Sequence, residues 1–239
     1  MSRARGRLYG LGVGPGDPEL LTLKALRLLR AAPVIAYPAP GHGDSLTRSI
    51  VAFWLKGHQQ EIPIRFPMRP GPPPVSIYDN AAVALAAELD RGRDVAWLCQ
   101  GDPFVYGSFI NIFARLAGRY RIEVVAGVSS LTAAAAAAEL PLVSHDETLT
   151  IIPATLNRDI IMARLSGADV AVIVKIGRHI EKIRRVLDQI GLLDSAIYVE
   201  HATLSTQRVA PLACINPGGA PYFSVVLVRC RGLTPLPPG

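Results

Sequence analysis

Cysteine is scarce in this sequence, which has three in 239 residues, at Cys99, Cys214 and Cys230. They form no CxxC pair, and an odd number does not suit a disulfide framework, so we expect free thiols and a cytoplasmic setting. A long apolar run is also absent, because the least polar stretch, 124–143, is interrupted by glycine, serine, glutamate and proline. The basic start, 1–7, leads into a glycine loop and not into an apolar signal segment. We therefore expect neither a membrane span nor a secretory signal.

Patterns for metal binding and for nucleic-acid binding are missing as well. The five histidines and three cysteines show no ligand spacing, so we predict no metal site. Lys and Arg number 25 against 19 Asp and Glu, and the net charge of +6 favours an anionic partner. Charge alone does not choose between nucleic acid and a polycarboxylate. The absence of a run of five basic residues, and of aromatic residues among the basic ones, argues against nucleic acid.

Strand and helix patterns alternate through the first part of the chain. The apolar spacing predicts strands at 7–14, 33–37, 94–99 and 121–125, and helices at 17–30, 45–56, 76–91, 106–116 and 129–138. Strands that alternate with helices imply right-handed crossovers and a mostly parallel sheet. The segment 63–74 holds six prolines, so we predict an irregular surface loop there.

The pattern changes in a short polar link around 139–148, where we place a domain boundary. The predicted domains are 1–143 and 144–239. In the second, we expect strands at 149–153, 169–175, 195–201, 208–214 and 222–229, and a helix at 179–191. The last strands have no helices between them, which favours a mixed sheet. The expected fold class is α/β, with a mostly parallel N-terminal sheet and a mixed C-terminal sheet.

The loop Gly12-Val-Gly-Pro-Gly-Asp17 follows a predicted strand and precedes a helix, which is where open parallel sheets bind nucleotide-like ligands. It is not a dinucleotide fingerprint, because Asp17 occupies the sixth position and its carboxylate would oppose a pyrophosphate. No Gly-Lys-Ser/Thr ending follows, and the segment 34–43 contains no acid to hold a ribose. The alternative is a plain tight turn in which Asp17 caps the next helix.

Two more loops follow predicted strands in the same way, at Gln100-Gly-Asp-Pro-Phe-Val-Tyr-Gly107 and at Ala126-Gly-Val-Ser-Ser130. Three glycine turns at the ends of strands in one sheet suggest a crevice. The hydroxyls of the third loop are placed to cap a helix or to meet a polar ligand. Three ordinary strand-to-helix turns remain the alternative.

Together these segments resemble the signature segments of the tetrapyrrole methylases. The matching parts are Gly12-Val-Gly-Pro-Gly-Asp17, Gly101-Asp-Pro103 with Tyr106, and Gly127-Val-Ser-Ser130, in this order and spacing. The resemblance covers essentially the whole chain. It implies two α/β domains, S-adenosylmethionine as cofactor in the cleft between them, and a homodimer.

Other segments resemble the subgroup that methylates precorrin-2 at C20 in cobalamin biosynthesis. They are 101–109, 174–178 and 207–209, together with Pro221-Tyr-Phe223. Two residues depart from the pattern: Ala126 replaces a proline that is usual in the family, and Gln100 stands where an acid is common in this subgroup. Gln100 makes a catalytic role at its position less favoured.

The resemblance implies a set of cofactor-binding residues, namely Pro15, Gly101, Asp102, Val105, Ser129, Ser130, Ile176 and Thr206. A loop of glycine backbone and an aspartate suits adenosylmethionine, which has no phosphate, better than it suits a nucleotide. For Asp102, a contact to the ribose or the amino group competes with an Asx contact that stabilises the turn before Pro103.

For the substrate we predict contacts from Arg65, Arg69 and Tyr106. The many carboxylates of precorrin-2 would explain the arginine excess, and Arg65 and Arg69, with Arg48 nearby, could clasp them through bidentate bonds. Solvated surface arginines are the alternative.

No general base stands out in the sequence. A reduced tetrapyrrole is already electron-rich at the acceptor carbon, so we hypothesise catalysis mainly by alignment. Glu200, His201 and His145 are weak candidates for accepting the meso proton. Methylation of uroporphyrinogen or another precorrin carbon, diphthine synthesis and ribosomal RNA methylation would reuse the same loops. Outside this class, a non-catalytic anion-binding module is the alternative, and it has no need of adenosylmethionine.

Overall fold

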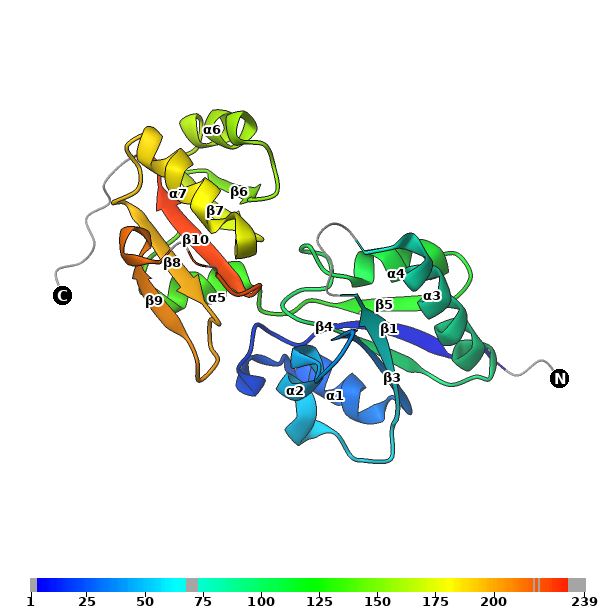
Figure 1. Cartoon of the computed structure of the whole chain (residues 1–239). Coiled ribbons are helices and arrows are strands. Elements are labelled where there is room, and N and C mark those ends of the chain that lie inside the picture. Colours follow the sequence, from blue (N-terminus) through cyan, green and yellow to red (C-terminus); the bar gives the residue numbers. More distant parts are fainter. Residues whose placement is uncertain (1–3, 68–72, 217, 219, 232–239) are drawn as a thin grey trace. The chain divides into compact units, whose positions relative to one another are not determined.

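The computed structural model describes residues 4–67, 73–216, 218 and 220–231 (Figure 1). Contacts divide the chain into two compact units, Met1–Ser129 and Ser130–Gly239. This division falls earlier than the predicted one after residue 143. The reason is the alanine-rich helix α5 (Ser130–Ala137), whose side chains Leu131 and Ala134 pack in the apolar cluster of the second sheet.

The first unit contains a five-stranded sheet in the order β3-β2-β4-β1-β5. Its strands are β1 (Arg7–Gly12), β2 (Val34–Pro40), β3 (Gln60–Phe66), β4 (Val95–Cys99) and β5 (Arg121–Val125). Every neighbouring pair is parallel. This confirms the predicted parallel sheet, and it brings the carboxyl ends of all five strands to one edge.

Helices cover both faces of this sheet. The helices α1 (Leu23–Ala31) and α2 (Leu46–Val51) share an apolar cluster with Ala96 and Leu98 of β4. The helices α3 (Val75–Asp90) and α4 (Phe109–Leu116) pack instead around Trp97, which lies between those two residues in sequence. Because successive strand residues point to opposite faces, one buried strand serves two cores.

The predicted helix 17–30 is in fact two elements. The 3₁₀ helix η1 (Pro18–Leu20) begins after Asp17, whose Oδ1 accepts a bond from Glu19 N at 2.8 Å. The helix α1 then starts after Thr22, whose hydroxyl accepts from Ala25 N at 3.2 Å. Asp17 therefore does cap a short helix, as the alternative interpretation of the first loop proposed.

The prediction of an irregular segment from Pro63 to Pro74 was wrong at its start, because Pro63–Phe66 belongs to the strand β3. This strand lies at the edge of the sheet and pairs only with β2. An edge strand tolerates a residue without an N–H, since one side of its backbone has no partner. Residues 68–72 lie outside the described part of the chain.

The second unit holds a mixed sheet in the order β6-β7-β10-β8-β9. Its strands are β6 (Leu149–Pro153), β7 (Val170–Val174), β8 (Ala196–Glu200), β9 (Arg208–Pro211) and β10 (Ser224–Arg229). Only β6 and β7 pair in parallel, while the other three neighbouring pairs are antiparallel. The predicted mixed sheet is confirmed.

This sheet also has helices on both faces. The helix α5 packs on one face, and α6 (Arg158–Ser166) and α7 (Ile180–Gln189) pack on the other. The sequence did not reveal α6. It buries only Ile161 and Leu165, one turn apart, and its contiguous Ile160, Ile161 and Met162 obscure the helical spacing. No helix among the described residues is long and apolar enough to span a membrane.

Candidate functional site

The three glycine loops come together at the carboxyl ends of β4, β1 and β5, which are adjacent strands of the first unit. Val13 N donates to Cys99 O at 2.9 Å, and Gly101 N donates to Gly14 O at 2.8 Å. The first and second loops are thus joined backbone to backbone, just beyond the paired strands β1 and β4.

Glycine is required where the third loop meets the other two. A Cβ on Gly127 would lie 2.2 Å from Gly101 O and 2.7 Å from Gly12 Cα. A Cβ on Gly12 would lie 2.6 Å from Gly127 Cα. Both distances are far inside van der Waals contact with backbone, so only glycine allows this approach.

Gln100 fastens the first loop to the second. Its Nε2 donates to Pro15 O at 2.9 Å. A carboxylate at this position could not donate that bond. The amide that departs from the subgroup pattern is therefore a structural bridge in this chain, a role that the sequence analysis missed because the bridge forms only when two distant loops meet.

Asp102 fastens the second loop to itself and to the third. Its Oδ1 accepts from Phe104 N at 2.8 Å, which is the Asx contact considered above, and its Oδ2 accepts from Gly127 N at 3.1 Å. An ionised carboxylate has about four acceptor positions, so it can still accept from a ligand. The predicted contact between Asp102 and the cofactor stays a prediction.

The other predicted residues of the first unit differ in exposure. Pro15 and Gly101 are buried in the joined loops, and Ser129 is half-buried. Val105 and Tyr106 are exposed on the turn after Asp102, with 40% and 48% of their surface accessible. Tyr106 has a left-handed backbone, at φ 56°. Such strain in a non-glycine residue clusters at binding and catalytic sites, so Tyr106 is a candidate contact.

The charge of the loops fits a ligand without phosphate. The segments 12–17, 100–107 and 126–129 contain no lysine or arginine, and their only charged residues are Asp17 and Asp102. A phosphate would find no countercharge there, whereas a sulfonium or an ammonium group would find two carboxylates. The charge of these loops therefore fits S-adenosylmethionine.

In the second unit the predicted residues lie after strands β7 and β8 or at the start of α5. Ser130 is exposed at the first position of α5. Ile176 is fully buried in the core, so any ligand contact would use its backbone. Thr206 is exposed, and its hydroxyl is 3.0 Å from His201 Nδ1.

Residues with a left-handed backbone follow the strands β7 and β8. Lys175 follows β7 with φ 58°, and His201 and Thr203 follow β8 with φ 50° and 70°. Left-handed backbone in such residues costs of order 1–3 kcal/mol each, and it persists where the surrounding structure holds it. These strained loops are a second candidate region in the fold.

Two of the three candidate bases are already engaged in this region. Glu200 Oε2 accepts from Tyr198 Oη at 2.6 Å, and burial together with this bond raises the pKa of Tyr198. His201 is paired with Thr206, as described above. Neither geometry by itself identifies a proton acceptor, so both assignments stay hypotheses.

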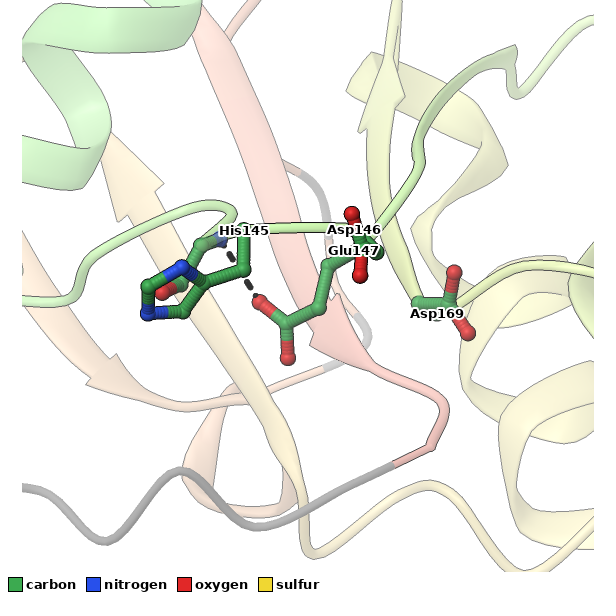
Figure 2. Close-up of a pocket in the computed structure, with 5 residues that line it drawn as sticks. His145, Asp146, Glu147 and Asp169 are labelled. Atoms are coloured by element: carbon green, nitrogen blue, oxygen red, sulfur yellow. Dashed lines mark hydrogen bonds between the residues drawn. The ribbon is translucent and has the colours of Figure 1, made fainter.

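The third candidate base, His145, lines a cavity of about 320 Å³ with Ser144, Asp146, Glu147 and Asp169 (Figure 2). In Figure 2, Glu147 lies between His145 and Asp169. Glu147 accepts from Ser144 N at 2.8 Å and pairs with Arg229 at 3.3 Å. Bonds from Thr148 hold the pKa of Asp169 below its usual value. These carboxylates thus fix the loop before β6.

No group of three or more histidine, cysteine or acidic side chains in the described residues is arranged to hold a metal ion. The prediction of a metal-free protein stays a prediction. All three cysteines are free: Cys99 is buried, which raises the pKa of its thiol, Cys230 is half-buried and Cys214 is exposed.

The predicted substrate arginines are only partly described. Arg65 lines a second cavity, of about 310 Å³, and Arg48 lines the same cavity. Arg69 lies outside the described residues. The structure thus brings Arg65 and Arg48 together in the first unit.

Comparison with known proteins shows the family of this chain. Residues 7–213 match the family model of the Tetrapyrrole (Corrin/Porphyrin) Methylases. The chain is 41% identical to a precorrin-2 C(20)-methyltransferase of a Sinorhizobium species, over 93% of this chain and 95% of that protein. The chain therefore belongs to the tetrapyrrole methylase family.

Two further likenesses extend this result. The chain is 41% identical to the cobalamin biosynthesis protein CobIJ of Mycobacterium bovis, over 94% of its own length but 46% of that protein, so it spans about half of that relative. A solved structure of uroporphyrin-III C-methyl transferase from Thermus thermophilus, complexed with S-adenyl homocysteine, shares the fold. Its TM-score is 0.65 at 23% identity, covering 93% of this chain and 92% of that one.

Proposed function

We propose that this protein transfers a methyl group from S-adenosylmethionine to C20 of precorrin-2 in cobalamin biosynthesis. The observation that carries the proposal is the cradle of three glycine loops, joined through Gln100 and Asp102 and free of phosphate-binding cations. The sequence identity to a precorrin-2 C(20)-methyltransferase over nearly the whole length supports the choice of substrate.

The residues proposed to hold the cofactor are those that the family resemblance implies, namely Pro15, Gly101, Asp102, Val105, Ser129, Ser130, Ile176 and Thr206. When bound, S-adenosylmethionine supplies an electrophilic methyl group. The joined loops hold their backbone groups in fixed positions before the ligand arrives, which lowers the entropy cost of binding.

In this mechanism the protein acts mainly by alignment. The acceptor carbon is electron-rich through its pyrrole nitrogens, and alignment of two reactants can lower a barrier by roughly 7 to 11 kcal/mol. The described residues of the three loops offer no histidine or lysine as a base, and both of their carboxylates already accept backbone bonds. A base for the meso proton would therefore come from outside these loops.

Glu200, His201 and His145 stay the hypothetical proton acceptors. We expect a variant with all three changed to alanine to lose about 10² to 10⁴-fold in kcat if one of them is the general base. Its affinity for S-adenosylhomocysteine is expected to fall little. Single-turnover methyl transfer measures the chemical step, and full activity in the triple variant would reject all three residues as bases.

The proposal also includes the substrate contacts and the cellular setting. Arg65, Arg69 and Tyr106 would meet the tetrapyrrole, with the arginines bonded to its carboxylates. The family resemblance supports a homodimer, and the three free thiols support a cytoplasmic setting. Light scattering in solution tests the dimer.

The decisive experiment is a calorimetric titration with S-adenosylhomocysteine, followed by an anaerobic methyl-transfer assay on precorrin-2 in the same preparation. Binding with one methyl added at C20 is the expected result. Binding without turnover would reject precorrin-2 as substrate and favour another tetrapyrrole. No binding would reject the methyltransferase and favour an anion-binding module.

A further inference from the structure

A cavity of about 310 Å³ lies beside α2 in the first unit. It is lined by residues of β2, β3, α2 and the segments on either side of α2: Tyr37, Ala39, Gly43, Asp44, Ser45, Arg48, Ser49, Ala52, Pro63 and Arg65. Its two cations, Arg48 and Arg65, differ in their bonding. That difference indicates what the cavity can bind.

Arg48 is neutralised and held in place. Its Nε and Nη2 donate to Glu61 at 3.2 and 2.9 Å, and Tyr37 Oη donates to the same carboxylate at 2.6 Å. The bond from Arg48 lowers the pKa of Glu61, and burial with the Glu61 bond raises the pKa of Tyr37 to about 12. Around neutral pH, Arg48 and Glu61 therefore stay charged and Tyr37 stays neutral. These three bonded side chains form a fixed wall of the cavity.

Arg65, in contrast, is held by backbone carbonyls. Its Nη1 donates to the carbonyls of Pro40 and Gly43, at 3.0 and 3.4 Å. No described carboxylate forms an ion pair with Arg65, although Asp44 also lines the cavity. Carbonyl bonds orient a guanidinium without cancelling its charge. Since a guanidinium has five donors in a planar fork, Nε and Nη2 are available for a bidentate bond to an anion.

The strand register places Arg65 level with the glycine loops. Arg65 pairs with Ala39, and Ala36 pairs with Trp97, so Ala39 stands at the level of Gln100. Three strand spacings separate β3 from β1 in the order β3-β2-β4-β1, which is roughly 14 Å. A tetrapyrrole macrocycle with its acidic side chains can bridge such a span.

We propose that this cavity is a carboxylate-binding subsite, in which Arg65 grips one acidic side chain of the tetrapyrrole and the Tyr37–Glu61–Arg48 triad forms its fixed wall. The subsite rests on the proposed function for its natural ligand. Asp44 opposes the anion, so the subsite binds one carboxylate with moderate affinity. In this proposal, substrate binding at β3 is separate from cofactor binding at the ends of β4, β1 and β5.

The test compares R65Q with R30Q, which removes an exposed arginine of the same charge from α1. The probe is uroporphyrin, a polycarboxylate whose binding is followed by fluorescence quenching, so that the test does not depend on methyl transfer. We expect R65Q to weaken uroporphyrin binding about tenfold, since a charge-assisted bond of this kind is worth about that factor. We expect D44N to strengthen it.

Further readouts distinguish the two proposals. The affinity for S-adenosylhomocysteine and the melting temperature are expected to stay at wild-type values in R65Q, and the KM for precorrin-2 is expected to rise with little change in kcat. Equal uroporphyrin binding by R65Q and R30Q would overturn the subsite, whatever the outcome of methyl transfer. A wild-type protein that binds uroporphyrin through Arg65 but does not methylate precorrin-2 would support the subsite and reject the proposed function.

Discussion

At the scale of single residues, one side-chain amide and one side-chain carboxylate link the three glycine loops to one another. Gln100 reaches the carbonyl of Pro15, and Asp102 reaches the N–H of Gly127. Each bond links loops that are distant in sequence. An apolar replacement at either position would leave a part-buried backbone group without this partner, which costs up to about 1–3 kcal/mol.

The variant Q100E tests the donor role of Gln100. At neutral pH the new carboxylate cannot donate to Pro15 O, so we expect the free energy of unfolding to fall by about 1–3 kcal/mol and the affinity for S-adenosylhomocysteine to weaken. At a pH below the pKa of the new carboxyl, its O–H can donate, and both losses should shrink. Urea denaturation and calorimetry at the two pH values measure this.

The matched control for this prediction is Q189E, which makes the same change at an exposed position of α7. It is expected to leave affinity at the wild-type value at both pH values. A Q100E protein that binds S-adenosylhomocysteine equally well at neutral and acidic pH would show that the bridge to Pro15 is dispensable.

At the scale of elements, the glycine loops depend on close backbone packing and not on any side chain. We expect G127A to lose binding of S-adenosylhomocysteine and at least about 1–3 kcal/mol of stability, because the added methyl would overlap Gly101 O. Calorimetry and thermal unfolding check the two effects.

The control is G167A, at the end of α6, where φ is −100° and an added Cβ meets nothing within 4 Å. It should retain both stability and binding. Were G127A to bind as tightly as G167A, the third loop would have to be separate from the cofactor cradle.

Whether an element could be predicted depended on how distinctive its residue pattern is. The buried strands β1, β4 and β7 were predictable, because continuous apolar runs bounded by turns have few other interpretations. The edge strand β3 was not, since Pro63 argues against a strand until its place at the edge is known. The helix α5 was predicted, but its alanines carry no information about which sheet they cover.

At the scale of the whole molecule, each unit has its own three-layer core and its own buried tyrosine bonded to a glutamate. Tyr37 donates to Glu61 in the first unit, and Tyr198 donates to Glu200 in the second. Burial and these bonds raise the pKa of both hydroxyls, that of Tyr37 to about 12. Each tyrosine therefore links the stability of its unit to alkaline pH.

The sign of this dependence follows from the raised pKa values. The stabilisation is complete below pH 10, the ordinary value for an unfolded tyrosine, and it is lost as the pH rises to about 12. We expect the free energy of unfolding to fall over this range and to fall less steeply in Y37F. Urea denaturation measures it, with Y222F, at an exposed position, as the control with the wild-type slope. Equal slopes in Y37F and wild type would contradict the linkage.

The sequence by itself determined the fold class, the positions of most strands along the chain and the family, because apolar periodicity and the three glycine segments are local features of the chain. It also pointed to Arg65 as a cation of interest. Only the tertiary structure decided what Gln100, Asp102 and Arg65 bond to, and that α5 packs with the second sheet. These depend on which distant segments meet, and the meeting of β1, β4 and β5 at one edge is a property of the folded sheet and not of any single segment.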